Sequence, residues 1–191
     1  KVPLSISETV LLLLAGAGFA QYGNFLMAIL QSFINSTTYQ ESMTRITEGK
    51  SLLMMIFWMG IVAPAAEEMI FRWLIYLRLR DWMKLPVAAV ISGLIFGIYH
   101  GNMVQGIYAS ILGTAFAWIL EMSGNIYSSM LLHMGANIWS LVITEYALDM
   151  FSMKYGVQIL ILIYLILLAS VVYCLTHFEK MYSVRKKKRM I

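Results

Sequence analysis

Charged residues are scarce in this chain. Of its 191 residues, 13% are Asp, Glu, Lys or Arg and 60% are apolar, whereas soluble domains average about a quarter charged residues. The mean hydropathy is +0.75, and several apolar runs approach the roughly 20 residues that a helix needs to cross a bilayer. This composition excludes an ordinary soluble domain and predicts a polytopic membrane protein.

Cysteine and aspartate are almost absent. The single Cys174 excludes an intrachain disulfide. The two aspartates, Asp81 and Asp149, fall between apolar runs, which excludes an aspartyl pair within the membrane. No HExxH sequence is present, which a zinc-dependent membrane protease of that type would contain. Ser128 and Ser129 lack a Gly-x-Ser-Gly setting, so a serine mechanism is disfavoured.

Six apolar runs predict the fold. They cover about residues 8–34, 51–79, 87–100, 103–121, 126–145 and 156–177. The second run would be about 44 Å long as one helix at 1.5 Å per residue, so we expect Pro64 to break it. The runs predict an all-α polytopic membrane helix bundle of about six transmembrane helices, with residues 1–191 forming a single integral membrane domain. Because the chain begins at Lys1 rather than Met, we expect a fragment or a processed product.

Lys and Arg are shared unevenly between the two predicted sides. The positive-inside rule places the richer side in the cytoplasm, which predicts a cell-membrane protein with both termini cytoplasmic. The RKKKR run at 185–189 fits a cluster beside anionic lipid better than a nucleic-acid contact, so we expect no nucleic-acid partner. The cytoplasmic side would hold Lys1, Arg78, Arg80, Lys84, Lys180, Arg185, Lys186, Lys187, Lys188 and Arg189, against Arg45, Lys50 and Lys154 outside.

The stretch PAAEEMIFR places three charges inside the second apolar run. A charge at the centre of a membrane helix costs about 2.5–3.5 kcal/mol, so such residues are rare and usually functional. Adjacent helical residues are separated by about 100° around the axis, whereas residues four apart share a face. We therefore expect Glu68 to pair with Arg72, which leaves Glu67 free to face the bundle.

Two further spans carry His100 and the pair His133 and Asn137, which share one helix face. Taken singly, an intramembrane His, an Asn or a Glu–Arg pair often serves only helix packing. Together with Glu67, these groups bring one carboxylate, two imidazoles and one amide from three spans into an apolar bundle. That combination predicts a reaction centre.

Three motifs carry a resemblance to a known family. EExxxR (Glu67, Glu68, Arg72), FxxxH (Phe96, His100) and HxxxN (His133, Asn137), in this order, resemble the CPBP family of CAAX proteases and bacteriocin-processing enzymes, also called the abortive-infection family. The resemblance covers about residues 51–145, a predicted four-helix catalytic core. One departure is Trp73, where the family commonly has Gly; it bears on the helix packing beside Arg72.

The resemblance implies an intramembrane endopeptidase that hydrolyses a peptide bond in a membrane-associated peptide or protein. The short chain resembles the bacterial branch, which removes leaders or processes peptides. Glu67 with His100 would activate water, and His133 with Asn137 would stabilise the oxyanion. Glu68, Arg72 and Phe96 would support these four groups.

Two alternatives remain open. Glu67, His100 and His133 also resemble a His₂Glu zinc set with an open fourth position. The cofactor is therefore either none or one divalent metal ion, with zinc as the candidate. Asn137 favours the metal-free scheme because an amide is a poor zinc ligand and a good oxyanion donor. A non-proteolytic scaffold, regulator or immunity protein could also keep the same pocket.

Overall fold

The computed structural model describes residues 3–33, 44, 48–146 and 156–188, and its regular elements are all helices. They are α1 (Ile6–Phe33), a long composite helix, α6 (Leu85–Tyr99), α7 (Met103–Ser123), α8 (Ile126–Tyr146) and α10 (Val157–Lys188). The composite helix consists of α3 (Leu52–Met55), η1 (Ile56–Val62), α4 (Ala63–Glu68), η2 (Met69–Tyr76) and α5 (Leu77–Trp82). These bounds agree with the six apolar runs to within three residues, except that α10 continues to Lys188, well beyond the predicted end at residue 177.

The chain is a polytopic helical membrane bundle, as its composition predicts. Within the described residues, five helices are long and apolar enough to cross a membrane: Ile6–Phe33, Leu52–Trp82, Met103–Ser123, Ile126–Ile143 and Val157–Lys188. The sixth apolar helix, α6, has 15 residues. It is therefore about 22 Å long, shorter than the roughly 30 Å of a hydrocarbon core.

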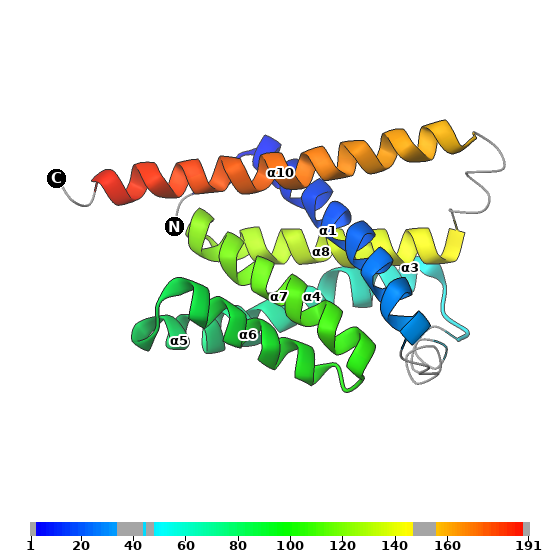
Figure 1. Cartoon of the computed structure of the whole chain (residues 1–191), viewed down its shortest axis with the longest axis horizontal. Helices are drawn as coiled ribbons and strands as arrows, with labels where there is room; N and C mark the ends of the chain where they lie inside the picture. The colour runs from blue at the N-terminus through cyan, green and yellow to red at the C-terminus, as the bar shows by residue number, and fades with distance from the viewer. Residues whose placement is uncertain (1–2, 34–43, 45–47, 147–155, 189–191) are drawn as a thin grey trace.

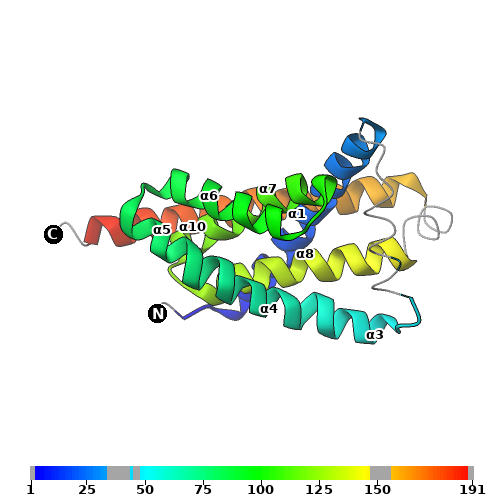
Figure 2. The same ribbon diagram turned by 90° about the horizontal axis from the view of Figure 1, so that it is seen from below.

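The helices pack around a core that is rich in aromatic residues. Helix α10 runs along one side of the bundle, and α1 crosses both α8 and α10 (Figure 1). The composite helix runs beside α8, and α6 forms an antiparallel hairpin with α7 (Figure 2). The largest buried cluster joins Leu12 of α1 and Phe178 of α10 to Phe96, Phe116 and Leu132 of the predicted catalytic helices. Helices α1 and α10 thus support the predicted catalytic helices directly.

The predicted break at Pro64 is wrong, because the composite helix continues through this residue. The chain widens into a π-helix just before Pro64: the N–H of Ala63 bonds to the carbonyl of Trp58, five residues back. In the same register the carbonyl of Met59 would need the N–H of residue 64, which proline lacks. The helix therefore passes Pro64 with the Met59 carbonyl left without a helical partner.

The connector at residues 83–84 sets the depth of two predicted site residues. Glu67 lies 15 residues before Trp82 (82 − 67), and His100 lies 15 residues after Leu85 (100 − 85). Residues equally distant from the turn of an antiparallel helix pair lie at the same level. This geometry brings the end of the short helix α6 to the level of Glu67.

Small residues let α6 and α7 approach closely. A Cβ atom added at Gly97 would lie 2.0 Å from Ser110 Oγ and 2.3 Å from the carbonyl oxygen of Gly106. Small residues at such positions are the usual means of close helix contact in membranes. The contact lies one turn before His100 and so determines where that imidazole stands.

Candidate active site

Glu68 and Arg72 form the buried ion pair that their spacing predicts. Arg72 Nε and Glu68 Oε2 are 3.2 Å apart, without hydrogen-bond alignment, and both side chains are fully buried. Arg72 Nη2 donates to the carbonyl of Gly113 at 3.1 Å. The guanidinium lies 4.5 Å from the ring centroid of Phe96 and 5.3 Å from that of Phe116. Aromatic faces thus surround the cation, which compensates part of its lost hydration.

His133 lies between the two glutamates. Its Nδ1 is 3.0 Å from Glu68 Oε1, and because a carboxylate accepts, Nδ1 carries the donated proton. The other nitrogen, Nε2, is 3.6 Å from Glu67 Oε2. The imidazole also stacks on Phe116, with ring centroids 4.6 Å apart and planes at 25°. Glu68 and Phe116 together hold His133 so that Nε2 faces Glu67.

Glu67 is the accessible member of this cluster. Its side chain is 20% exposed, against 5% for His133 and 0% for Glu68. It is close enough to both His133 and His100 for a Coulombic interaction with each. A carboxylate that can be reached beside two imidazoles is the arrangement that acid–base chemistry requires.

His100 caps the end of α6. Its Nδ1 is 2.9 Å from the carbonyl oxygen of Phe96, and because a carbonyl only accepts, Nδ1 is the donor. In the neutral ring, Nε2 is then left with a free lone pair. The Phe96 ring contacts both imidazoles edge-on, at centroid distances of 4.7 Å from His100 and 5.5 Å from His133. Phe96 is therefore the spacer that holds the two histidines apart.

Asn137 has a structural partner that the HxxxN spacing does not predict. Its Nδ2 donates to the carbonyl of Met59 at 2.8 Å, the group that Pro64 leaves unpaired. The amide therefore closes the gap in the composite helix and joins it to α8. One N–H of the side-chain amide is used in this bond, and the second remains for another acceptor.

Helix α7 carries none of the three motifs, yet two of its residues contact the site. Phe116 stacks on His133, and Gly113 accepts from Arg72. A Cβ at Gly113 would lie 2.9 Å from the Phe96 ring and 3.0 Å from Arg72 Nη2, so only glycine fits there without a shift. Neither residue stands out in the sequence, because an apolar phenylalanine and a glycine are ordinary in a membrane helix.

Trp73, the departure from the family pattern, does not pack beside Arg72. Its side chain is 55% exposed and lines a separate groove together with Met69 and Leu77. The buried pocket around Arg72 is formed by Gly113, Phe96 and Phe116 instead. The tryptophan therefore leaves the environment of the Glu68–Arg72 pair intact.

The described side chains do not form the alternative zinc set. Among them, no group of three or more His, Cys, Asp or Glu residues is arranged to hold a metal ion. The Nδ1 atoms of His100 and His133 already contact the Phe96 carbonyl and Glu68. Metal dependence stays a prediction, to be tested by adding a chelator to the purified protein.

Residues 49–139 match the family model described as type II CAAX prenyl endopeptidase Rce1-like. This part of the chain, a little under half of its length, is similar to the Rce1-like family. The match contains every residue of the three motifs, from Glu67 to Asn137. The resemblance to CAAX proteases that the motifs indicate is thereby confirmed for the Rce1-like segment.

One curated relative agrees with this assignment. Over 89 residues the chain is 29% identical to the Bacillus subtilis (strain 168) protein named "Putative membrane peptidase YdiL". The alignment covers 47% of this chain and 36% of that protein, so the chain spans well under half of the relative's length. No solved structure matches the chain. The assignment to a family therefore depends on sequence similarity, and the arrangement of the site residues supports it independently.

Proposed function

We propose that this chain is an intramembrane endopeptidase that hydrolyses a peptide bond in a membrane-associated peptide or protein, with removal of leaders or other peptide processing in a bacterial cell as its role. The match to the Rce1-like family model supports proteolysis, and the printed name of the Bacillus relative supports a membrane peptidase. The observation that carries the proposal is the accessible Glu67 carboxylate held opposite His133 Nε2 at 3.6 Å.

In the proposed reaction, Glu67 removes a proton from a water molecule, and the free Nε2 of His100 accepts the second hydrogen bond of that water. The water oxygen forms a bond to the scissile carbonyl carbon, whose oxygen becomes the oxyanion. The tetrahedral intermediate then collapses, the C–N bond breaks, and the proton held by Glu67 passes to the leaving nitrogen. No further reactant is required.

The oxyanion would lie between His133 and Asn137. Because Nδ1 of His133 already donates to Glu68, donation from Nε2 requires the imidazolium. With this imidazolium, the charges of Glu67, Glu68, Arg72 and His133 sum to zero. Asn137 contributes its second N–H from the same face of α8, one turn away. Donors fixed before the reaction are the most effective stabilisers of developing charge.

A co-expression experiment tests the activity. Candidate peptides encoded beside the gene for this chain are expressed with the wild-type protein or with its Glu67→Ala variant, and their masses are measured. We expect a shortened peptide only with the wild-type protein. Equal shortening with both proteins would assign the cleavage to another enzyme. Peptides that stay intact with a correctly inserted wild-type protein would favour the scaffold alternative.

A further inference from the structure

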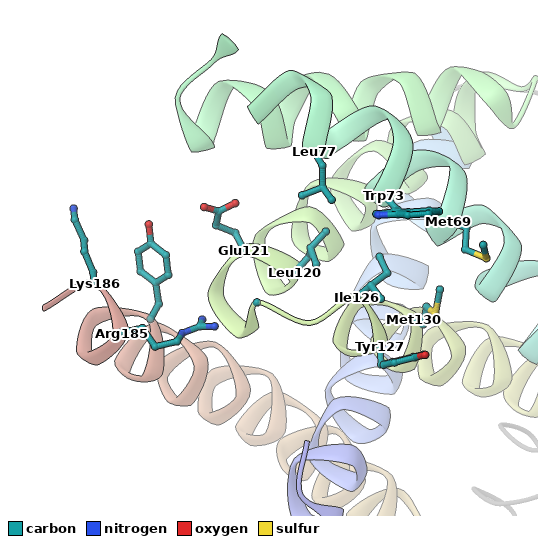
Figure 3. Close-up of a pocket in the computed structure, with 12 residues that line it drawn as sticks. Met69, Trp73, Leu77, Leu120, Glu121, Ile126, Tyr127, Met130, Arg185 and Lys186 are labelled. Carbon is teal, nitrogen blue, oxygen red and sulfur yellow. The ribbon is translucent and has the colours of Figure 1, made fainter. Parts of the chain in front are cut away.

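A groove of about 660 Å³ lies beside the candidate active site, between the composite helix, the α7–α8 turn and the end of α10. Figure 3 shows its two ends: Met69, Trp73 and Ile126 lie at one, and Glu121, Arg185 and Lys186 at the other. None of Glu67, His100, His133 and Asn137 lines it. The volume is within the roughly 300–1,000 Å³ of small-molecule sites. The groove is therefore large enough for a ligand and separate from the catalytic groups.

The charged end of the groove is positive. Glu121 is its one acidic lining residue, and both of its oxygens are occupied: Oε1 by Arg80 at 2.9 Å, and Oε2 by Arg80 at 3.1 Å and Tyr76 at 2.8 Å. Arg185 donates to the carbonyls of Ser123 and Met122. These carbonyls are neutral, so Arg185 keeps its positive charge, and Lys186 is exposed.

Arg185 also has one N–H donor that is not used in a hydrogen bond within the described residues. Its Nε is buried and has no hydrogen-bond partner within the part of the chain that the structure describes. A buried donor without a partner costs about 1–3 kcal/mol, so an acceptor supplied by a ligand would be favoured there. The group that fits a cationic pocket with an unpaired N–H is an anion rich in oxygen, such as a phosphate.

We propose that the groove binds one anionic phospholipid. The phosphate would lie against Arg185 and Lys186, and an acyl chain would follow the apolar wall formed by Met69, Trp73, Leu77 and Ile126. Basic pockets between membrane helices are known to take anionic headgroups. Three of the four wall residues are substantially exposed on the outer surface of the bundle, Met69 at 48%, Trp73 at 55% and Leu77 at 37%. A lipid can therefore enter from the side, without passing through the active site.

Native mass spectrometry of the purified 191-residue chain in detergent tests this proposal. The protein is mixed with phosphatidylglycerol or with phosphatidylcholine, and retained lipid is counted per chain. We expect one molecule of phosphatidylglycerol to be retained preferentially. Lys186→Gln should weaken retention about fivefold, since one basic residue near a membrane surface contributes about 1 kcal/mol. Leu77→Trp, which fills the apolar wall, should weaken it without changing any charge.

Lys188→Gln is the matched control, because it removes the same charge from the same helix outside the groove. This variant should retain the lipid like the wild type, and glycerol phosphate without acyl chains should not displace it. Equal retention of both lipids would overturn the proposal. So would equal losses in Lys186→Gln and Lys188→Gln, no effect of Leu77→Trp, or a co-purified peptide that occupies the groove in place of lipid. None of these readouts depends on peptide cleavage.

Discussion

Asn137 and Pro64 are linked through one carbonyl group. The π-helix before Pro64 leaves Met59 O without a partner, and Asn137 Nδ2 supplies one at 2.8 Å. We predict that Asn137→Ala lowers the free energy of unfolding by about 1 kcal/mol, the net contribution of a typical hydrogen bond, since this one is part-buried. In a Pro64→Ala background the new N–H of residue 64 can reach Met59 O, so the same substitution should cost clearly less.

This comparison is a double-mutant cycle, measured by unfolding in mixed detergent–lipid micelles. The coupling free energy of the cycle measures the hydrogen bond from Asn137 to the Met59 carbonyl, independently of any effect on peptide cleavage. Equal costs of Asn137→Ala in the two backgrounds would show that the Met59 carbonyl does not link these residues. If Asn137 also stabilises the oxyanion, Asn137→Ala should remain poorly active even in the Pro64→Ala background, where the bond is no longer needed.

Phe116 orients His133 by stacking and is the site residue that the motifs miss. We predict that Phe116→Leu lowers peptide cleavage about 10²-fold, the low end of what a misplaced acid–base group costs. The loss of stability should be modest, about 0.5–3 kcal/mol. Cleavage should fall because, without the Phe116 ring 4.6 Å away, the His133 imidazole can rotate about its hydrogen bond to Glu68.

Phe178→Leu provides the control for Phe116. Phe178 is also completely buried in the same aromatic core, and it contacts His177 rather than His133. We expect a similar loss of thermal stability and nearly unchanged cleavage. Equal cleavage losses in the two variants would mean that Phe116 acts only through stability.

The hairpin of α6 and α7 places His100, and its closest contact lies at Gly97. A Cβ there would lie 2.0 Å from Ser110 Oγ and 2.3 Å from Gly106 O. We predict that Gly97→Ala separates the two helices, costs about 1–3 kcal/mol of stability and lowers cleavage because His100 moves away from Glu67. Gly106→Ala is the matched control on the facing helix, since its nearest atom, Gly97 O, would be 3.2 Å away. A larger effect of Gly106→Ala than of Gly97→Ala would contradict this description of the contact.

The helices were predictable from the sequence because each apolar run is bounded by polar or glycine-containing connectors, as at 83–84 and 101–102. The Glu68–Arg72 pair was also predictable, because residues four apart face each other on any helix. The π-helix at Pro64 was not, since a proline in a helical run is compatible with a break, a kink or a change of register. The stack of Phe116 on His133 depends on how α7 and α8 are rotated about their axes, which their mostly apolar sequences do not specify.

The orientation of the whole molecule in the membrane is a prediction. Helix α7 ends between two basic residues, because Arg80 binds Glu121 at 2.9 Å and Arg185 binds the carbonyl of Ser123 at 2.6 Å. Figure 1 shows α5 and the basic end of α10 at the same end of the bundle. Lys1, Arg45, Lys154 and Arg189 of the charge count lie outside the described residues. We expect this basic end to face the cytoplasm.

Reporter fusions test the orientation. A reporter placed after Arg189 should be active in the cytoplasm, and one inserted near Thr44 should be active only on the other side. A cysteine placed beside Glu67 in a Cys174→Ser background should then react with a polar thiol reagent added from the cytoplasm. Labelling only from the outer side would show that substrate is met after export.

The role of Glu67 is the central claim, and the cleavage rate of the purified chain in liposomes tests it most directly. A peptide that is cut in cells is offered to the wild-type protein, to Glu67→Gln and to Glu179→Gln, an identical exchange at an exposed position of α10. All three should have the same helix content and thermal midpoint. Glu67→Gln should cleave about 10²–10⁴-fold more slowly, the usual contribution of a general base, and Glu179→Gln should match the wild type. A folded Glu67→Gln protein that cleaves at the wild-type rate would contradict the account.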